Sequence, residues 1–172
     1  MDSNTIIQNI VRFVLLILAQ LLILNNVNLS GFAIPYLYIL FILMLPTNTG
    51  RIAMLLCAFA AGLTIDIFSN MLGFHTFACV IVAFARILFA DRILTRNQDI
   101  TISKPSIHSV KPQYFVGYTV VLTGLFNFVY FAIELFDNHG FWKLIAITLL
   151  STLLTSALIV LTQLVFTKKE RV

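Results

Sequence analysis

Long apolar runs are the feature of this sequence that most constrains its fold. Six of them follow one another along the 172 residues, separated by polar breaks or by proline. Hydrophobic residues make up 60% of the chain and charged residues only 10%, whereas a soluble domain has about 25% charged residues. A soluble domain of about 150 residues leaves about 30% of its unfolded-chain surface exposed, so it could not hide this much apolar surface. The sequence therefore predicts an all-α polytopic membrane protein, with one integral membrane domain over residues 1–172.

The apolar runs predict a bundle of six transmembrane helices, of which the second is unusually short. It covers about residues 33–45, with Pro35 in its first turn and Pro46 after its end, where proline is tolerated. Its thirteen residues reach only about 20 Å at a rise of 1.5 Å, against a hydrocarbon core of about 30 Å. This segment must therefore thin the bilayer, recruit residues 30–32, or fail to cross. The six predicted helices cover about residues 6–24, 33–45, 51–68, 74–93, 114–136 and 142–166.

The distribution of basic residues predicts the topology. If all six helices cross, the segments on one side of the membrane hold eight Lys and Arg residues, and those on the other side hold only Lys143. Such an excess marks the cytoplasmic side, so both termini are predicted to be cytoplasmic. If the second helix does not cross, only the N-terminus changes side, and that end carries Asp2 as its one charged side chain. The eight residues are Arg51, Arg92, Arg96, Lys104, Lys111, Lys168, Lys169 and Arg171.

The longest polar stretch, residues 95–113, is predicted to be a cytoplasmic connector. Long loops are often functional, and the alternative is a solvated linker held near anionic lipid headgroups by its basic residues. Because basic residues are spread between apolar runs and form no patch, the formal charge of +4 does not indicate nucleic-acid binding. Tyr36 and Tyr38 are predicted to lie in an aromatic belt at the outer interface.

Four charged residues fall inside the predicted helices, where each costs at least about 2.5–3.5 kcal/mol at the bilayer centre. Arg12 and Arg86 lie toward the inner side and are interpreted as anchors whose long side chains reach the interface. Arg92 and Arg96 are inner-side basic residues that would hold the connector near anionic headgroups. Asp66 and Glu134 lie in the outer third. Asp66 is predicted to face protein and to pair with His75, Lys143, a neighbouring hydroxyl or a helix of a partner protein. Three readings of this polar group stay open: a structural cluster, a partner-binding site, and an ion or proton relay.

Small and hydroxyl-bearing residues predict where the helices touch, because they let membrane helices approach closely. The third helix has Ala58, Gly62 and Asp66 at four-residue steps, and the fourth has Cys79 and Ala83. The last helix carries a polar stripe. Its members are Thr148, Thr152 and Ser156, with Ser151 and Thr155 beside them.

Motifs of enzymes are absent from the sequence. It has no Gly-rich phosphate loop, no His-Glu-x-x-His and no Gly-x-Ser-x-Gly. The three histidines and two cysteines lie at spacings that suggest no metal cluster. The sequence therefore predicts a protein that is not an enzyme and holds no cofactor or metal.

The segment from Gly62 to His75, Gly-Leu-Thr-Ile-Asp-Ile-Phe-Ser-Asn-Met-Leu-Gly-Phe-His, resembles the Gly-Leu-x-x-Asp…Gly signature of the MreD family of bacterial rod shape-determining membrane proteins. The Leu45-Pro46 break and the region of Arg86 also resemble that family. The resemblance extends over nearly the whole chain, and it makes Gly62, Asp66 and Gly73 motif residues.

The resemblance implies a non-enzymatic scaffold of the elongation machinery in the bacterial cytoplasmic membrane. Such a protein would bind an MreC-like partner and couple MreB filaments to peptidoglycan synthesis by RodA and its transpeptidase partner. The family is also similar to the substrate-binding S-components of energy-coupling-factor transporters, so a small-molecule binding subunit is the alternative. S-components typically carry an Ala-x-x-x-Ala contact motif on the first helix, where this chain has only Ala19. An unrelated assembly factor is a third possibility.

Overall fold

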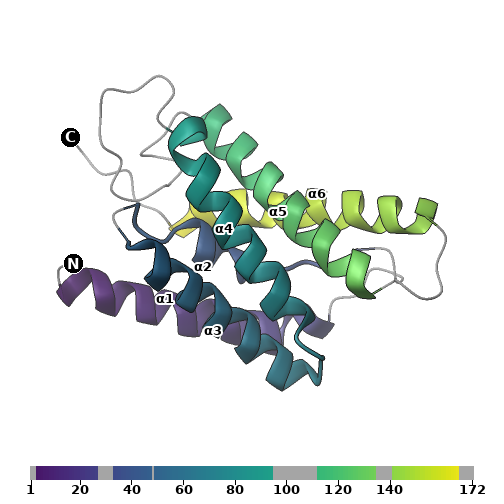
Figure 1. The fold of residues 1–172 in the computed structure, drawn as a ribbon, viewed down its shortest axis with the longest axis horizontal. Helices are drawn as coiled ribbons and strands as arrows, with labels where there is room; N and C mark the ends of the chain where they lie inside the picture. Colours follow the sequence, from purple (N-terminus) through teal and green to yellow (C-terminus); the bar gives the residue numbers. More distant parts are fainter. Residues whose placement is uncertain (1–2, 27–32, 48, 95–111, 135–140, 167–172) are drawn as a thin grey trace.

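The described residues fold into a bundle of α-helices. The computed structural model describes residues 3–26, 33–47, 49–94, 112–134 and 141–166, and within these ranges there is no β-strand. Figure 1 shows the helices running back and forth between two ends of the bundle. The elements are α1 (Ser3–Leu22), the short 3-10 helix η1 (Leu24–Asn26), α2 (Ile39–Leu43), α3 (Arg51–Ser69), α4 (Phe74–Leu94), α5 (Pro112–Glu134) and α6 (Phe141–Phe166).

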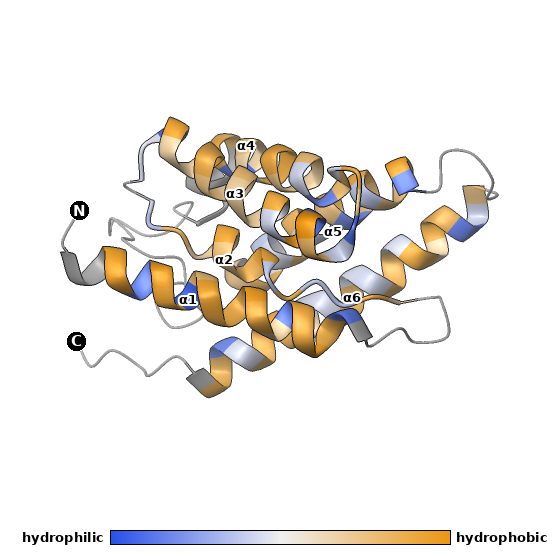
Figure 2. Ribbon diagram, turned by 90° about the horizontal axis from the view of Figure 1, so that it is seen from below, coloured by the Kyte–Doolittle hydropathy of each residue, from blue (hydrophilic) through white to orange (hydrophobic). Residues whose placement is uncertain are grey.

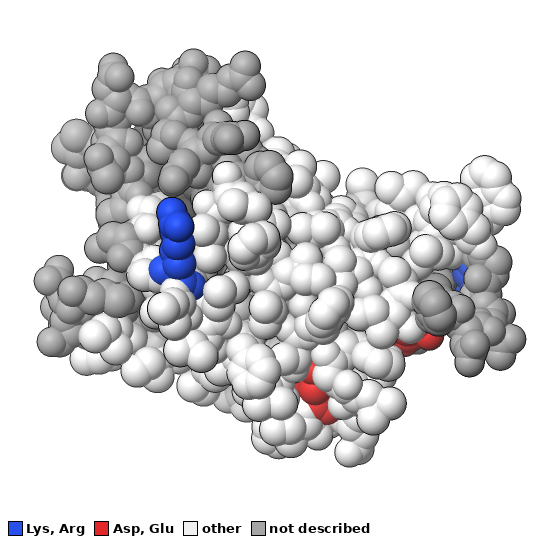
Figure 3. All heavy atoms as spheres, in the orientation of Figure 1, with Lys and Arg blue, Asp and Glu red and all other residues white. Residues whose placement is uncertain are grey.

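Three of these helices, α3, α5 and α6, are long and apolar enough to cross a membrane. Shorter apolar helical stretches occur in α1 and α4, at Ile6–Leu22 and Phe74–Leu88. Figure 2 shows that hydrophobic residues dominate most of the helices, and Figure 3 shows a face whose described surface is almost entirely uncharged. Many large apolar side chains are exposed while Asn, Gln, Thr and Ser side chains are buried, as lipid surroundings favour. The prediction of an all-α fold is confirmed for the described residues, and three of the helices have the length and composition that a membrane span requires.

Neighbouring helices in the chain are neighbours in space. α3 packs against α4, α4 against α5, and α5 against α6, while α1 lies beside α3. The start of α1 and the end of α6 lie at the same end of the bundle, at the left of Figures 1 and 2. The turn between α3 and α4 lies toward the opposite end.

Most helix boundaries lie within a few residues of the predicted ones. α3 ends at Ser69 and α4 begins at Phe74, each within one residue of the expected position. α5 begins at Pro112 instead of residue 114, because proline lacks only an N–H that the first helical residue does not use. The predicted connector 95–113 lies almost entirely outside the described residues.

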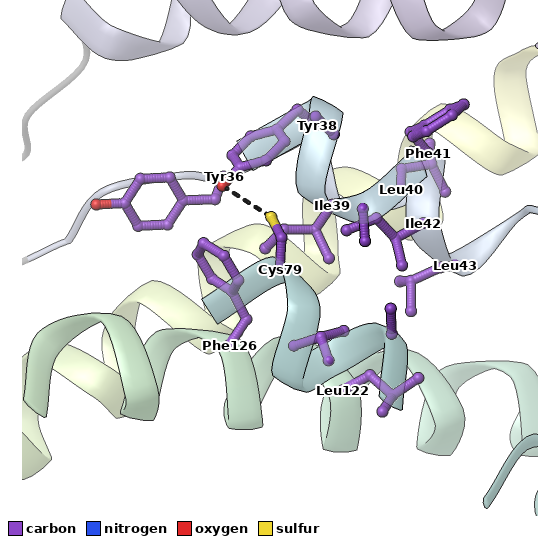
Figure 4. Packing of buried hydrophobic residues seen from close by; sticks show 14 of the residues in the cluster. Tyr36, Tyr38, Ile39, Leu40, Phe41, Ile42, Leu43, Cys79, Leu122 and Phe126 are labelled. Atoms are coloured by element: carbon purple, nitrogen blue, oxygen red, sulfur yellow. Dashed lines mark hydrogen bonds between the residues drawn. The ribbon is translucent and has the colours of Figure 1, made fainter. Parts of the chain in front are cut away.

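The predicted helix over residues 33–45 is wrong for most of its length. Residues 33–36 are not helical, and α2 is confined to the five residues Ile39–Leu43. The physical reason is Pro35, which disfavours a helical conformation at Ile34 and cannot donate a backbone hydrogen bond. This central segment, residues 33–45, does not face lipid: Tyr38, Ile39 and Leu43 are fully buried in the middle of the bundle (Figure 4). It contacts α1, α3, α4 and α5.

Hydroxyl groups of α6 and an amide of α1 satisfy the non-helical backbone of this segment. The amide of Ile34 donates to Oγ of Ser151 at 3.1 Å, and that of Tyr36 donates to Oγ1 of Thr155 at 3.2 Å. The Pro35 carbonyl accepts from the amide of Gln20 at 3.0 Å. Irregular backbone at membrane depth is tolerated only where protein groups or water satisfy it. The polar stripe of the last helix therefore faces the bundle as predicted. Two of its hydroxyl groups accept hydrogen bonds from the non-helical backbone of the central segment.

This arrangement predicts the effect of Thr155→Val, which removes a hydroxyl with almost no change of shape. The buried amide of Tyr36 loses its partner, so we expect the free energy of unfolding to fall by about 1–3 kcal/mol. Thr162→Val is the matched control, because its hydroxyl donates to the Leu158 carbonyl of the preceding turn within α6. Thermal unfolding in detergent measures both variants, and equal melting temperatures would contradict the assignment.

Candidate functional site

Asp66 is the centre of the polar cluster that the sequence predicts. Its side chain is 2% exposed, on the last part of α3. Oδ1 accepts from the amide of His75 at 3.1 Å, while Oδ2 accepts from the amide of Thr76 at 2.8 Å and from its hydroxyl at 2.5 Å. These amides are among the first of α4, which have no partner within their own helix. Because Gly73, just before α4, has no side chain to cap them, Asp66 does so from the preceding helix.

The backbone carbonyl of Asp66 stabilises the turn between α3 and α4 from the α3 side. Its carbonyl accepts from the amides of Asn70 and Met71, the latter at 2.9 Å, which closes the end of α3. Asn70 has left-handed backbone angles (φ 52°, ψ 38°), and Gly73 has a φ of +92°. Glycine adopts such a φ without strain, which explains its place in the motif. The carboxylate lies near the negative end of α3 but caps the positive end of α4, so the two helix dipoles offset each other there.

Gly62 lets α3 and α4 come close enough for this cap. A Cβ atom at Gly62 would lie 2.7 Å from the amide nitrogen of Thr76 and 2.8 Å from the carbonyl oxygen of His75. Both neighbours are backbone atoms of the first turn of α4, which cannot move without disturbing the cap. Gly62, Asp66 and Gly73 therefore act together in one helical hairpin.

We expect Gly62→Ala to lower the free energy of unfolding by about 1–3 kcal/mol, the usual effect of overpacking. The new methyl group would push α4 away from α3 and lengthen the Asp66 hydrogen bonds. Gly117→Ala on α5 is the control, because a Cβ there meets no atom within 4 Å and alanine has the higher helix propensity. In thermal unfolding in detergent, Gly62→Ala should melt below the wild type, and Gly117→Ala should melt at or above it. A Gly62→Ala protein as stable as Gly117→Ala would contradict the close approach.

His75 does not pair with Asp66 through its ring, which corrects part of the sequence-based expectation. Its imidazole is 4% exposed and packs against Tyr130, with ring centroids 4.5 Å apart. Nδ1 lies 3.0 Å from the hydroxyl of Tyr38, which accepts from the thiol of Cys79 at 3.5 Å. Figure 4 shows the link between Tyr38 and Cys79 in the centre of the apolar core. Asp66 accepts from the backbone amide of His75 and from the amide and hydroxyl of Thr76, while the His75 ring joins an aromatic cluster.

Glu134 and Lys143 are not among the hydrogen-bond partners of Asp66. Glu134 is the last residue of α5 and interacts with the side chain of Tyr130, which in turn contacts His75. Lys143 is exposed in the first turn of α6. Among the described residues, Glu134 is therefore linked to the cluster through the side chain of Tyr130.

The sequence analysis interpreted Arg86 as an anchor that reaches the interface, and this interpretation is wrong. The side chain is 1% exposed, and Nε donates to the hydroxyl of Tyr118 at 2.7 Å. The two terminal nitrogens donate to Sδ of Met54 at 3.1 Å and to the carbonyl of Leu45. Tyr118 in turn donates to the carbonyl of Leu43 at 3.1 Å. Arg86 and Tyr118 thereby satisfy carbonyls that the end of α2 leaves free.

The other basic residues that the sequence analysis named are Arg12, Arg92 and Arg96. The side chain of Arg92 and the whole of Arg96 lie outside the described residues. Arg12 is half-buried on α1.

Sequence reasoning missed the tyrosines of the central segment. Tyr36 is 3% exposed and Tyr38 is fully buried, so neither belongs to an interfacial belt. Tyr36 contacts His75, Phe126 and Tyr130, with centroids 5.2–5.4 Å apart. The one available signal was their position inside a segment too short to cross as a helix, which favours burial in the protein.

The fold and this cluster define a bundle of apolar helices, three of which could span a membrane, and its interior is held by capped helix ends, buried polar groups and aromatic rings. Among the described residues, no three His, Cys, Asp or Glu side chains are grouped so that they could hold a metal ion. Comparison with protein-family models, curated proteins and solved structures gives no match for this chain.

Proposed function

We propose that this chain is an MreD-like scaffold of the bacterial cell-elongation machinery. In this role it has no catalytic activity, binds an MreC-like protein in the cytoplasmic membrane, and couples MreB filaments to peptidoglycan synthesis by RodA and its transpeptidase partner. The observation that carries the proposal is that the residues of the family resemblance are hydrogen-bonded in two groups. Asp66 caps the helix that follows Gly73, and Arg86 binds the carbonyl beside the Leu45-Pro46 break.

The use of these polar groups supports a scaffold over the alternative of a small-molecule carrier. The carboxylate of Asp66 and the guanidinium of Arg86 are hydrogen-bonded within the chain, and Tyr36, Tyr38, His75 and Phe126 pack against one another in the interior. Buried groups that satisfy one another rigidify a fold and specify one arrangement of its helices. A rigid bundle with an apolar outer surface suits association with the transmembrane segment of a partner.

Co-purification in mild detergent tests this function. The full chain, expressed with an MreC-like protein, should retain it in a fixed ratio, whereas a single-span membrane protein of unrelated function serves as the control. The purified chain should also carry no vitamin-sized ligand. Loss of the MreC-like protein together with stoichiometric retention of a small molecule would overturn the scaffold proposal in favour of the carrier.

The proposed topology has six crossings and both termini in the cytoplasm, with residues 33–45 crossing inside the protein. It rests on the excess of basic residues in alternate segments. Reporter fusions should place residues 95–113 and both termini inside, and Asn70 and Asn138 outside. An N-terminus found outside, with Lys168 inside, would show that residues 33–45 do not cross.

A further inference from the structure

Arg12 differs from the other charged residues inside the apolar helices, because the fold supplies no partner for it. Three of these charges interact within the chain: Asp66 caps α4, Arg86 binds the segment that follows α2, and Glu134 binds a tyrosine of its own helix. Arg12 is half-buried on α1, and within the described part of the chain its guanidinium makes no hydrogen bond or ion pair. Charged side chains in an apolar layer are costly and are almost always paired. The partner of Arg12 is therefore expected outside these residues.

The position of Arg12 along α1 indicates which kind of anion it meets. Arg12 is the tenth of the twenty residues of α1, so about 14–15 Å of helix separate it from each end. Arginine side chains that reach lipid headgroups do so from positions near helix ends. From the middle of α1 the guanidinium instead meets the group that packs against the helix. A carboxylate is the anionic group that another protein helix can bring to this position.

The face of α1 that carries Arg12 is accessible to such a helix. α1 contacts α3 and the central segment, and Figure 2 shows it in front of the other helices. Residues at alternating steps of four and three form a stripe along α1, and each of them is exposed or half-buried. This spacing is typical of a helix that packs along a second helix at a small angle. The Arg12 stripe consists of Gln8, Arg12, Leu15, Ala19 and Leu22.

We propose that a transmembrane helix of a partner protein packs along the Arg12 stripe and places the carboxylate of an Asp or Glu against the guanidinium of Arg12. A guanidinium and a carboxylate form two parallel hydrogen bonds, so each satisfies the charge of the other. Leu15 and Leu22 contact apolar side chains of the partner helix, and Ala19 lets the two backbones approach. The identity of the partner, an MreC-like protein, rests on the proposed function, whereas the recognition of a carboxylate does not.

Binding of a model peptide in phospholipid vesicles tests the recognition of a carboxylate. The probe is a leucine-rich transmembrane helix with one central glutamate, and the control peptide has glutamine there. Energy transfer between the labelled full chain and each peptide should show that the glutamate peptide binds about five- to thirtyfold more tightly. Equal binding of the two peptides by the wild type would overturn the proposal.

Two variants assign this preference to Arg12. Arg12→Gln should abolish the preference for glutamate, whereas Arg51→Gln, which removes an exposed charge at the start of α3, should keep it. Arg12→Gln should also melt no lower than the wild type, because the guanidinium has no partner among the described residues. Its loss of binding is then not an effect of misfolding. A preference that persists in Arg12→Gln would overturn the proposal.

Co-purification with an MreC-like protein tests the identity of the partner. Arg12→Gln should retain at least about fivefold less of that protein than the wild type, and Arg51→Gln the same amount as the wild type. Arg12→Glu should retain it again when the acidic residue of the partner helix is replaced by arginine. Equal retention by the wild type and Arg12→Gln would overturn the proposal. Binding of the glutamate peptide without retention of any MreC-like protein would overturn the proposed function alone.

Other occupants of the Arg12 stripe give different results. Release of bound phosphatidylglycerol in Arg12→Gln, with unchanged binding of the glutamate peptide, would assign the guanidinium to a lipid phosphate and overturn the proposal. Energy transfer between two labelled copies of the chain that is lost in Arg12→Gln, without a preference for the glutamate peptide, would assign the stripe to a second copy and also overturn it.

Discussion

Asp66→Ala is expected to lower the free energy of unfolding by about 3–5 kcal/mol. The substitution removes a buried carboxylate that accepts two backbone amides and one hydroxyl, and hydrogen bonds to charged groups contribute about 1.5–3 kcal/mol each. It also leaves the first amides of α4 buried without partners. In thermal unfolding, a loss of about 3 kcal/mol corresponds to roughly 6–12 °C in Tm for a chain of this size.

Graded variants test whether capping is the cause. Asp66→Asn keeps one acceptor oxygen but turns an N–H toward one of the α4 donors, so its effect should be smaller than that of alanine. Thr76→Val removes only the hydroxyl bond to the carboxylate and should cost about 1.5–3 kcal/mol, less than Asp66→Ala. Thr64→Ala is the control on the same helix, because its hydroxyl donates to the Ala60 carbonyl of the preceding turn within α3.

The same series separates an internal role from a partner contact. If Asp66 only caps α4, the amount of MreC-like protein retained per folded molecule should not change in Asp66→Asn. Wild-type melting together with weaker co-purification would instead place the function of Asp66 at an interface. Unchanged melting and unchanged retention in Asp66→Ala would contradict both.

The helical elements could be predicted because they depend on local composition. Apolar runs and polar breaks define α3 to α6 to within a few residues, since each helix satisfies its own backbone in the membrane. Residues 33–45 could not be predicted in this way, because Pro35 is compatible both with a first helical turn and with an extended segment. The extended conformation is stabilised by Ser151 and Thr155. They lie 117 and 119 residues beyond Ile34 and Tyr36, whose backbone amides they bind.

The candidate site could be predicted as a location but not as a set of bonds. The four-residue spacing of Ala58, Gly62 and Asp66 correctly indicated that Asp66 faces protein. Its actual partners depend on how closely α3 and α4 approach, and this follows from the missing Cβ of Gly62.

The prediction for Arg86 was wrong because it considered only the depth of the residue in the membrane. It did not consider which face of α4 carries the side chain. Cys79, Ala83 and Arg86 are spaced i, i+4 and i+7, which puts them on one side of α4, and all three are buried. A long basic side chain on the face of small residues points into the bundle. That signal was present in the sequence.

Arg86→Lys, although it keeps the positive charge, is expected to be the more damaging of two substitutions at this position. Arg86 spreads its charge over three nitrogens that reach Tyr118, Met54 and the Leu45 carbonyl, none of which is charged. A lysine carries the charge on one strongly hydrated nitrogen, so it would be buried with fewer hydrogen bonds. We expect a loss of about 3 kcal/mol or more in the free energy of unfolding.

Arg86→Met provides the comparison that identifies the cause. It removes the buried charge along with the hydrogen bonds, so only the unpaired Leu45 carbonyl remains, at a cost of about 1–3 kcal/mol. Arg51→Lys, at an exposed position at the start of α3, should change stability by less than about 0.5 kcal/mol. Thermal unfolding in detergent should therefore rank Arg51→Lys above Arg86→Met, and Arg86→Met above Arg86→Lys. If Arg86→Lys melts like Arg51→Lys, the guanidinium does not hold the end of α2, and the Leu45-Pro46 break must be fixed by the packing of the central segment alone.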